Sequence, residues 1–501
     1  MADDRLVLAL DQGTTSSRAI AFGRDGRPVA TAQQPFEQRY PSPGHVTHDP
    51  EAIWQSQLAV AREVVAAVGG AERIAAIGIT NQRETTIVWD RATGQPVADA
   101  IVWQSRITAP ACEALRAGGL EPLFRQRTGL PIDAYFSGPK IAHILDGQPG
   151  LRARAERGEL AFGTVDSFLA WRLTGGRRHV TDVSNASRTL LFDIHRLAWD
   201  AELLDLVGVP ASMLPEIVPT SGIVGETDPS LLGGPIPIGA LVGDQQAATF
   251  GQACFEAGDA KTTYGTGAFL LRNIGTSPVV SPNRLITTVL WQLAPGGPAV
   301  YGHEGSVFVA GAAVQWLRDG LRAFDSSADI EALAASVEDA GGVVVVPAFT
   351  GLGAPYWDPD ARGAIMGITR GTGLAHIARA TLDSIVQQVA DVVEAMTDDI
   401  GTAPSIMRVD GGAAANNALL QDQADILGTA VERPVVTETT ALGAAGLSGL
   451  AVGYWKNLEE FGATWALDCR FEPATGDAER LKRRRRWAMA VDRVRGWAIE
   501  P

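Results

Sequence analysis

Short apolar runs alternate with turn-forming residues at the start of the chain. Residues 6–10 (LVLAL) and 18–22 (RAIAF) each have the length and apolar content of a buried strand. Residues 11–17 between them are rich in glycine and hydroxyl side chains, which is typical of a hairpin turn, and Asp25-Gly26 marks a second turn. The pattern predicts a three-strand meander, completed by residues 28–32, at the edge of a sheet.

A helical pattern follows the meander. Asp49 and Pro50 supply an N-cap and a first helical residue, and apolar residues then recur every three or four positions up to Val68. Two further apolar strands are predicted at 74–79 and 85–89. Because strands and helices are mixed along the chain, we expect an α/β fold.

The two halves of the chain share a weak repeat. Gly13-Thr14 lies between two apolar strands, and Gly265-Thr266 does the same about half a chain length later. Two similar domains, each presenting a Gly-Thr hairpin to a shared cleft, would explain this spacing and the length of 501 residues. We therefore expect an N-terminal domain at 1–250 and a C-terminal domain at 251–501.

Two other stretches have a distinctive composition. Residues 210–237 are rich in proline and glycine and are interpreted as a surface excursion of the first domain. Residues 441–453 are apolar, but they fall short of the roughly 20 residues that a membrane span needs. Their alanines and glycines predict a tightly packed internal helix instead.

Charge and cysteine content narrow the class of protein. Asp and Glu outnumber Lys and Arg by 57 to 42, a net charge of −15, so most of the surface would repel nucleic acid and anionic lipid. Cys112, Cys254 and Cys469 lie far apart and in no CxxC pair, which argues against a disulfide framework or a zinc knuckle. We expect a soluble cytoplasmic protein with no membrane span and no nucleic-acid partner.

Familiar nucleotide motifs are missing, since the chain has neither GxxxxGK[ST] nor a complete GxGxxG. The hairpins at 13–17 and 265–267 offer another way to hold phosphate, because small residues let backbone N–H groups converge on an anion while hydroxyls add donors. Ordinary turns are the alternative. Asp11, at the end of a buried strand, is placed to hold Mg²⁺ directly or through water, or else to cap the turn.

Two more predicted strands end in an acidic residue. Asp244 follows the apolar run 238–242, and Asp410 precedes Gly411-Gly412 at the end of another strand. Ligands of open α/β sheets bind at the carboxyl ends of strands, which favours both positions as site residues. The Gly-Gly turn would let a flat ring approach the backbone, and Asn416 could hydrogen-bond that ring. A simple tight turn is the alternative.

Several of these segments together resemble the FGGY carbohydrate kinases, in particular the members that phosphorylate glycerol. The resemblance extends along nearly the whole chain and is carried by residues 8–18 (LALDQGTTSSR), 77–86 (IGITNQRETT), 243–247 (GDQQA) and 409–412 (VDGG). Residues 363–383 are similar to the second signature of that family. The resemblance implies two domains of the actin/hexokinase-like ATPase fold, which is ribonuclease H-like, around a central cleft.

The resemblance also implies the site residues. The hydroxyls of glycerol would be contacted by polar side chains, namely Arg83, Glu84, Tyr135, Asp244 and Gln245. Its carbon backbone would pack against two aromatic side chains, Trp103 and Phe269. The nucleotide would be held by Thr14, Thr15, Ser16, Arg18, Thr266, Gly311 and Gln315, with Gly412 and Asn416 at its adenosine end. From the residues alone, Arg83-Glu84 reads as a local ion pair, and tryptophan and phenylalanine are more often core residues.

The implied reaction is transfer of the γ-phosphoryl group of MgATP to the primary 3-hydroxyl of glycerol, giving sn-glycerol 3-phosphate and ADP. Asp244 would be the catalytic residue that accepts the hydroxyl proton, and Mg²⁺ would lie near Asp11. The two domains would close around glycerol, with a hinge near residue 250, to exclude water. The resemblance further implies a homodimer or homotetramer.

The chain departs from the family pattern at two places. His143 stands where the first family signature usually has tryptophan, and residues 232–236 lack the arginine with which regulated bacterial members bind a sugar bisphosphate. Inhibition by fructose 1,6-bisphosphate is therefore not expected. The basic run Lys482–Arg486 is interpreted as a solvated helix face, with an anionic partner as the alternative.

Two rival functions remain open at this point. One is another FGGY polyol or sugar kinase, which a comparison of acceptors would reveal. The other is a non-kinase ATPase of the actin type, which would release ADP without any polyol.

Overall fold

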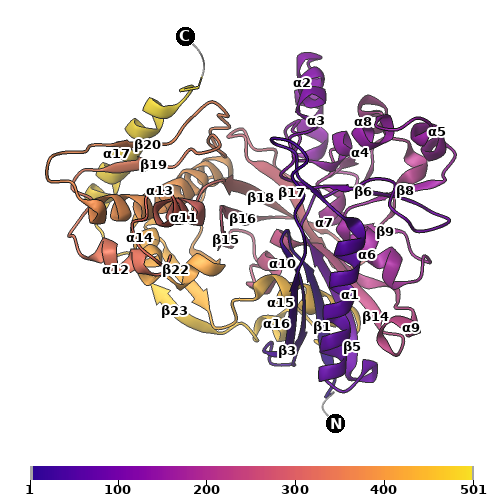
Figure 1. Ribbon diagram of the computed structural model, residues 1–501. Coiled ribbons are helices and arrows are strands. Elements are labelled where there is room, and N and C mark those ends of the chain that lie inside the picture. The colour runs from indigo at the N-terminus through magenta and orange to yellow at the C-terminus, as the bar shows by residue number, and fades with distance from the viewer. Residues whose placement is uncertain (1–3, 499–501) are drawn as a thin grey trace.

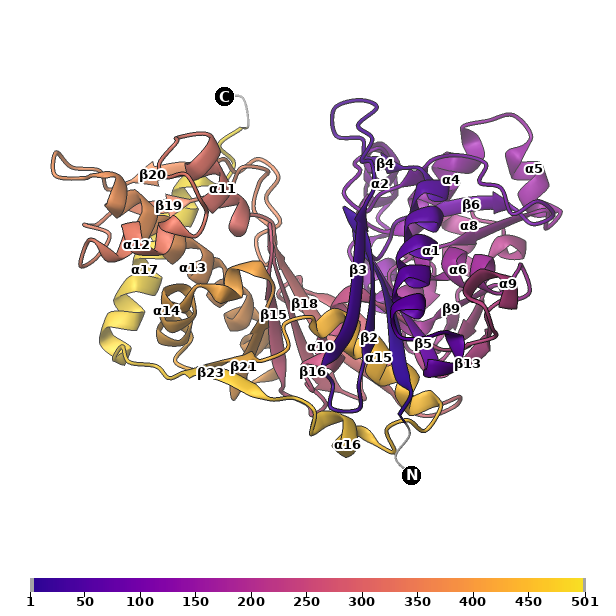
Figure 2. The same ribbon diagram turned by 60° about the horizontal axis from the view of Figure 1, so that its bottom comes forward.

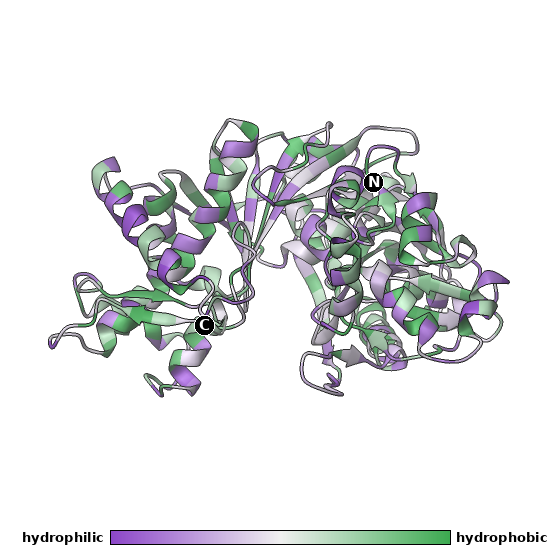
Figure 3. Ribbon diagram, turned by 90° about the horizontal axis from the view of Figure 1, so that it is seen from above, coloured by the Kyte–Doolittle hydropathy of each residue, from purple (hydrophilic) through white to green (hydrophobic). Residues whose placement is uncertain are grey.

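The structure, a computed structural model, describes residues 4–498 and consists of two bodies that lie side by side (Figure 1). Each body contains a mixed β-sheet with helices packed against it. Strands from residues before 250 form the first sheet, and strands from residue 260 onward form the second. Helices in both bodies carry hydrophilic and hydrophobic positions in alternation, as expected when one side faces a core (Figure 3). The chain therefore has the α/β architecture that the sequence predicts.

The first sheet has six strands in the order β13-β14-β5-β1-β2-β3. Their bounds are β1 Leu6–Gln12, β2 Ser16–Phe22, β3 Pro28–Pro35, β5 Ile74–Asn81, β13 Ser221–Glu226 and β14 Pro237–Gly243. Strands β1, β2 and β3 pair antiparallel, and β3 is the edge strand, which confirms the predicted meander. Strand β5 runs parallel to both β1 and β14. The carboxyl ends of these three parallel strands therefore meet at one edge of the sheet.

Helix α1 (Pro50–Ala67) packs its apolar side on the first sheet. The side chain of Asp49 accepts a hydrogen bond from the backbone N–H of Glu51, so the predicted N-cap is confirmed. Ile53 and Trp54 of this helix are buried in the same apolar cluster as the sheet residues. The predicted amphipathic pattern thus places α1 on the sheet.

The second sheet has seven strands in the order β17-β18-β16-β15-β21-β22-β23. Their bounds are β15 Ala260–Tyr264, β16 Ala268–Gly275, β17 Ile286–Gln292, β18 Ala299–Val307, β21 Ile406–Asp410, β22 Ala430–Pro434 and β23 Leu467–Phe471. Strands β15 and β16 form an antiparallel hairpin, and β21 runs parallel to β15. This repeats the arrangement of β1, β2 and β5, so each sheet carries one of the two predicted Gly-Thr hairpins.

The remaining elements cover the sheets or form small accessory pairs. In the first body they are β4 Thr47–His48, β6 Ile87–Asp90, β7 Ala100–Ile101, α2 Ala109–Ala117, α3 Glu121–Thr128, α4 Ser137–Asp146, α5 Leu151–Glu156, β8 Leu160–Gly163, α6 Val165–Leu173, β9 Val180–Asp182, α7 Val183–Ala186, β10 Phe192–Asp193, β11 Ala198–Trp199, α8 Ala201–Val207, β12 Glu216–Val218, α9 Pro229–Leu232 and α10 Asp244–Gly251. In the second half of the chain they are α11 Gly311–Asp319, α12 Asp329–Ala335, β19 Val344–Val346, β20 Ala364–Met366, α13 Leu374–Ile400, α14 Asn417–Leu427, α15 Thr439–Ala451, α16 Leu458–Gly462 and α17 Asp477–Val494. Short 3₁₀ turns lie at Ala71–Arg73, Ala211–Met213 and Gly412–Ala415.

Two stretches differ from the sequence-based expectation. Residues 210–237 are not simply a surface excursion, because β13 within them pairs antiparallel with β14 and forms an edge of the central sheet. The predicted strand at 85–89 forms as β6, but it pairs with β8 in a separate two-stranded sheet. Both stretches contain β structure whose partners could not be assigned from local pattern.

Helix α15 belongs to the second half of the sequence, yet it packs against β1, β5 and β14 of the first sheet and against α10. Figure 2 shows α10 and α15 between the two sheets. Residues 441–449 are buried, so the predicted tightly packed internal helix is confirmed. A Cβ atom added at Gly443 would lie 1.8 Å from the carbonyl oxygen of Ala247. The two helices therefore touch backbone to backbone, and only glycine fits at this contact.

We expect Gly443→Ala to lower the free energy of unfolding by about 1–3 kcal/mol, because the added methyl group forces the two helices apart. Gly222→Ala is the matched control, since a Cβ atom at Gly222 meets nothing within 4 Å. Urea unfolding of both variants measures the difference. Equal stability of the two variants would contradict the close helix contact.

Two arginines of the basic run in α17 form ion pairs with other helices. Arg483 pairs with Asp422 at 2.8 Å, and Arg484 pairs with Asp391 at 2.6 Å and with Glu394 at 2.7 Å. These two arginines attach α17 to α13 and α14, whereas Lys482, Arg485 and Arg486 are exposed, so the predicted solvated face is confirmed for three of the five residues. Within residues 4–498, none of the helices combines the length and apolar composition needed to cross a bilayer.

Candidate active site

Residues from three neighbouring strand ends meet at the carboxyl edge of the first sheet. In the strand register, Thr80 of β5 lies opposite both Asp11 of β1 and Val242 of β14. Arg83 follows β5 and Asp244 follows β14, so both lie at the edge where Asp11 ends its strand. The sequence-based placement of ligands at strand ends thus brings these three charged residues to one region.

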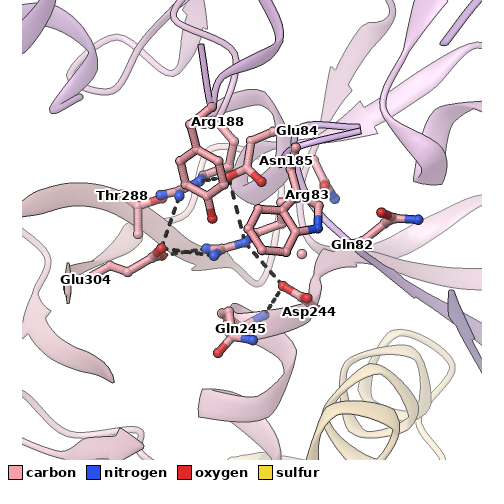
Figure 4. A network of polar contacts seen from close by, with 12 residues as sticks. Gln82, Arg83, Glu84, Asn185, Arg188, Asp244, Gln245, Thr288 and Glu304 are labelled. Carbon is pink, nitrogen blue, oxygen red and sulfur yellow. Dashed lines mark hydrogen bonds and ion pairs between the residues drawn. The ribbon is translucent and has the colours of Figure 1, made fainter. Parts of the chain in front are cut away.

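Arg83 is the centre of a buried charge network (Figure 4). Its guanidinium forms two hydrogen bonds with Glu304 of β18, at 2.5 and 2.9 Å, and its Nε lies 3.2 Å from Oδ1 of Asp244. Arg188 joins Glu84, at 2.6 Å, to Glu304, at 3.1 Å. Arg83, Glu84, Arg188 and Glu304 are all buried. Nε of Arg83 lies 4.0 Å from Oε1 of Glu84. The ion pair between these two neighbours, which the sequence suggests, is therefore only a weak part of a larger network.

The carboxylates of this network have different acidities. Burial raises the pKa of Glu304, but the guanidinium groups of Arg188 and Arg83 outweigh burial and bring that pKa down to about 2. Burial raises the pKa of Asp244 above its ordinary value, and Arg83 and Lys261 only partly oppose this. Glu304 is therefore the permanent counter-ion of the arginines. Asp244, whose side chain is 31% exposed, is the better placed of the two to exchange a proton.

Aromatic side chains form one wall beside this network. The ring of Trp103 meets the rings of Tyr135 and Phe269 edge to face, with centroids 5.7 and 6.4 Å apart. The guanidinium of Arg188 lies 5.6 Å from the centroid of Tyr135. The indole N–H of Trp103 donates to the Thr14 hydroxyl at 3.0 Å, which connects the aromatic wall to the first hairpin. All three predicted aromatic residues are thus brought together.

The turn that carries Arg83 and Glu84 is fixed by hydrogen bonds from helix α4. Glu84 has a positive φ of 62°, a backbone conformation uncommon for residues other than glycine. Its carbonyl oxygen accepts hydrogen bonds from the Ser137 hydroxyl, at 3.1 Å, and from the ammonium of Lys140, at 3.2 Å. These contacts fix the turn, and with it the direction of both charged side chains.

The first hairpin presents hydroxyls and one guanidinium. The side chain of Arg18 pairs with Asp11 and with Glu438, at 2.6 Å in each case. Thr14 and Ser16 are half-buried and Thr15 is exposed, and the hydroxyls of Thr14 and Ser16 accept hydrogen bonds, which leaves their hydrogens free to donate. The predicted phosphate residues therefore share one turn, with Arg18 held between two carboxylates.

The second hairpin lies against the start of α11. The backbone N–H of Gly311 donates to the Gly265 carbonyl at 3.0 Å, and that of Ala312 donates to the Thr266 carbonyl at 3.0 Å. Gln315 follows on α11 and is exposed. Thr266, Gly311 and Gln315 are thus neighbours in space, although they are far apart in the sequence.

The Gly-Gly turn after β21 lies next to the same hairpin. Gly411 has a φ of 86°, and a Cβ atom there would lie 2.4 Å from the carbonyl oxygen of Tyr264, so a side chain is excluded. Gly412 is exposed. The side-chain oxygen of Asn416 caps α14 by accepting from the backbone N–H of Leu419 at 2.9 Å, so its amide NH₂ is the group left to meet a ring.

Three charged residues of the site were missed by sequence reasoning. These are Arg188, Lys261 and Glu304, all of them buried. Lys261 and Glu304 lie within strands β15 and β18. A charged residue inside a strand requires a buried partner, and this was the one available signal. The identity of the partner cannot be read from local sequence.

The oxygen groups near Asp11 suit a divalent cation only in part. Burial raises the pKa of Asp11, and the guanidinium of Arg18 opposes this only in part. The negative charge of Asp11 is therefore not fully balanced by Arg18. Arg18 takes Oδ2 and leaves Oδ1 without a hydrogen bond to any described residue. Within residues 4–498, no group of three or more His, Cys, Asp or Glu side chains is arranged so that it could hold a metal ion by itself. A magnesium ion here would rely on one carboxylate, water and phosphate oxygens, which is a common arrangement for Mg²⁺.

Two family models match the chain in succession. Residues 6–251 match the N-terminal domain of the FGGY family of carbohydrate kinases, and residues 260–452 match its C-terminal domain.

Named relatives are similar over almost the whole chain. A glycerol kinase from Symbiobacterium thermophilum is 59% identical over 99% of both chains. Glycerol kinase 2 from Thermotoga maritima is 57% identical over 98% of this chain and 99% of its own.

Solved structures give the same picture of the fold. A glycerol kinase from Plasmodium falciparum, solved with ADP, superimposes with a TM-score of 0.92 at 35% identity and covers 98% of both chains. A xylulose kinase from Lactobacillus acidophilus superimposes with a TM-score of 0.87 at 20% identity over 97% of both chains, which bears on the fold alone.

Proposed function

The chain belongs to the FGGY family of carbohydrate kinases, and from this premise we propose that it phosphorylates glycerol with ATP, giving sn-glycerol 3-phosphate and ADP. The observation that carries the proposal is the arrangement around Arg83, where a fixed guanidinium, two carboxylates and an aromatic wall face one another. Relatives at 57–59% identity that bear the name glycerol kinase support this choice of acceptor.

The proposed acceptor site suits a small triol. Arg83 and Gln245 would donate hydrogen bonds to hydroxyl oxygens, while Glu84 and Asp244 would accept them, with Tyr135 completing the set. Trp103 and Phe269 would pack against the carbon backbone. Because each buried polar group left unpaired is costly, an acceptor that lacks one hydroxyl should bind much more weakly.

Asp244 is the proposed catalytic residue. Its carboxylate would orient the attacking hydroxyl and accept its proton. A carboxylate is a weak base toward an alcohol, but its raised pKa reduces the mismatch. The transition state of phosphoryl transfer is loose, so the proton leaves late and positioning of the oxygen matters most. Arg83 holds the Asp244 carboxylate in place at 3.2 Å.

The nucleotide would be held between the two hairpins. Thr14, Thr15, Ser16 and Thr266 would donate hydroxyl or backbone hydrogens to the phosphates, and Arg18 would add a positive charge. Gly311 and Gln315 would also contact the nucleotide, and Gly412 and Asn416 would hold its adenosine end. When bound near Asp11, Mg²⁺ supplies charge neutralisation at the β- and γ-phosphate oxygens.

We also propose the wider setting of this reaction. The division into domains at 1–250 and 251–501, with a hinge near residue 250, would let the halves close on glycerol and exclude water. The three free cysteines fit a reducing cytoplasm. The family resemblance suggests a homodimer or homotetramer, which light scattering would measure.

A coupled ADP-release assay with a panel of acceptors tests the proposed function. We expect ADP release when glycerol is added, and little release with water, xylulose, ribulose or gluconate. Equal release without any polyol would favour an ATPase of the actin type. Faster release with a sugar than with glycerol would favour another member of the same family.

A further inference from the structure

Lys261 is a buried cation next to the proposed acceptor site. It lies on β15, and its side chain is fully buried. Its ammonium donates to Oε1 of Gln245 at 2.5 Å and to the hydroxyl of Thr263 at 2.7 Å. Among residues 4–498, no carboxylate lies within 4.0 Å of it as an ion-pair partner. Burying an ammonium without a direct ion pair costs free energy. A buried lysine at this position is therefore expected to have a specific role.

The contact fixes the direction of the Gln245 amide. An ammonium can only donate hydrogen bonds, so the group of Gln245 that faces it must be the carbonyl oxygen. The amide NH₂ is then turned to the opposite side, where it has no hydrogen-bond acceptor within the described part of the chain. Gln245 is half-buried and follows Asp244 at the start of α10 (Figure 4). The NH₂ group is therefore available to a ligand that lies against Asp244.

Lys261 is itself held in place from the second sheet. The Thr263 hydroxyl that accepts from Lys261 donates in turn to Asp410 at 2.5 Å. The other carboxylate oxygen of Asp410 accepts from Gln252, at 2.8 Å, and from Thr439, at 2.7 Å. A continuous set of hydrogen bonds thus runs from the strand before the Gly-Gly turn to Gln245.

The charges around the ammonium are mixed. Burial lowers the pKa of Lys261, while the carboxylates of Asp410, Asp244 and Glu304 oppose this and the guanidinium of Arg83 adds to it. The ammonium in turn lowers the pKa of Asp244, on which Arg83 acts in the same direction and Asp11 in the opposite one. Lys261 therefore acts on both residues that begin α10, through a hydrogen bond to one and through its charge on the other.

We propose that Lys261 is a positioning residue for the acceptor: it locks Gln245 so that the amide NH₂, and not the carbonyl, faces the acceptor hydroxyl beside Asp244. This inference rests on the proposed function. A hydroxyl has one hydrogen to donate and lone pairs to accept. With Gln245 donating to the oxygen and Asp244 accepting the hydrogen, the hydroxyl is held in a single orientation for attack.

A double-mutant cycle tests the proposal. The ADP-release assay with glycerol is run on the unaltered chain and on the K261M, Q245A and K261M/Q245A variants. Loss of one buried hydrogen bond of about 1–3 kcal/mol predicts that each single substitution lowers kcat/KM for glycerol about 5- to 150-fold. The KM for ATP should stay within about twofold, because neither side chain belongs to the nucleotide set. The double variant should be little worse than Q245A alone, since Lys261 acts through Gln245.

Fully multiplicative losses in the double variant would overturn the proposal. The Q245E variant is a second test, which leaves Lys261 unchanged and so does not depend on the folding of K261M. Glutamate keeps the shape of Gln245 and its contact with the ammonium, but it presents an acceptor oxygen where the NH₂ group had been. We expect Q245E to lose as much kcat/KM for glycerol as Q245A, and a near-normal value would also overturn the proposal.

The two hypotheses fail in distinguishable ways. If the proposed function is wrong, the unaltered chain shows no glycerol-dependent ADP release before any variant is made. If only the role of Lys261 is wrong, the unaltered chain is active and the cycle is multiplicative. Thermal unfolding and ADP titration of each variant show that fold and nucleotide binding are retained.

Discussion

Replacing Asp244 with asparagine is expected to lower kcat with glycerol by at least about a hundredfold, the usual range for loss of a general base. Asparagine has nearly the same shape, but it cannot accept the hydroxyl proton and it removes the carboxylate that Arg83 holds at 3.2 Å. The ADP-release assay at saturating glycerol measures the change. ADP affinity, measured by calorimetry, should be retained because the nucleotide set does not include Asp244. A near-normal kcat would refute the base assignment.

The pH dependence of the same reaction carries a second signature of Asp244. Burial raises the pKa of this carboxyl, so on acidification the basic form is lost at a higher pH than for an ordinary aspartate of pKa 3.8. The rate of the unaltered chain should therefore begin to fall at a higher pH than the titration of an ordinary aspartate would give. The residual rate of the asparagine variant should lack this acid limb. The same limb in the variant would assign it to another group.

Replacing Glu304 with glutamine is expected to lower the free energy of unfolding by about 3–5 kcal/mol, the usual effect of removing one partner from a buried ion pair. Glu304 is the counter-ion that Arg83 and Arg188 share, and all three side chains are buried. Glutamine keeps the shape of the side chain, but it leaves the guanidinium groups of Arg83 and Arg188 without their shared negative charge. Glu113→Gln is the matched control, because Glu113 pairs with Arg116 on the surface, where such pairs contribute about 0–1 kcal/mol.

Urea unfolding at several pH values checks the mechanism of this loss. The pKa of Glu304 is lowered from 4.5 in the unfolded chain to about 2 in the fold. The stabilisation is therefore fully present above pH 4.5 and is lost as the pH falls toward 2. The difference in stability between the unaltered chain and the glutamine variant should shrink over this window. A difference that is independent of pH would mean that packing, and not charge, is responsible.

Local signals in the sequence were sufficient for much of the fold. The meander, α1 and its cap, and both Gly-Thr hairpins were predicted because hydrophobic period, turn residues and capping residues act over a few positions. Asp244 was predicted as a site residue because ligands of open α/β sheets bind at the carboxyl ends of strands. Polar and glycine-rich β13 was missed, because only its pairing with β14 makes it a strand of the central sheet.

The rest of the candidate site depends on contacts that no local pattern encodes. Glu304 lies 221 positions from its partner Arg83, and Arg188 lies 104 positions from Glu84. A buried charge signals that a partner exists, but only the folded chain shows which residue it is. The family resemblance supplied Arg83 and Glu84, yet it supplied neither their counter-ions nor Lys261.

The shared use of Arg83 limits how the acceptor preference of this enzyme can be redesigned. A longer sugar would need a different set of groups at this position. Any replacement for the guanidinium of Arg83 also removes an ion-pair partner of Glu304, which is buried. A single substitution of Arg83 toward a new acceptor would therefore cost stability as well as change specificity. Engineering or natural divergence would have to exchange residues 83, 188 and 304 together, which makes this corner of the molecule slow to evolve.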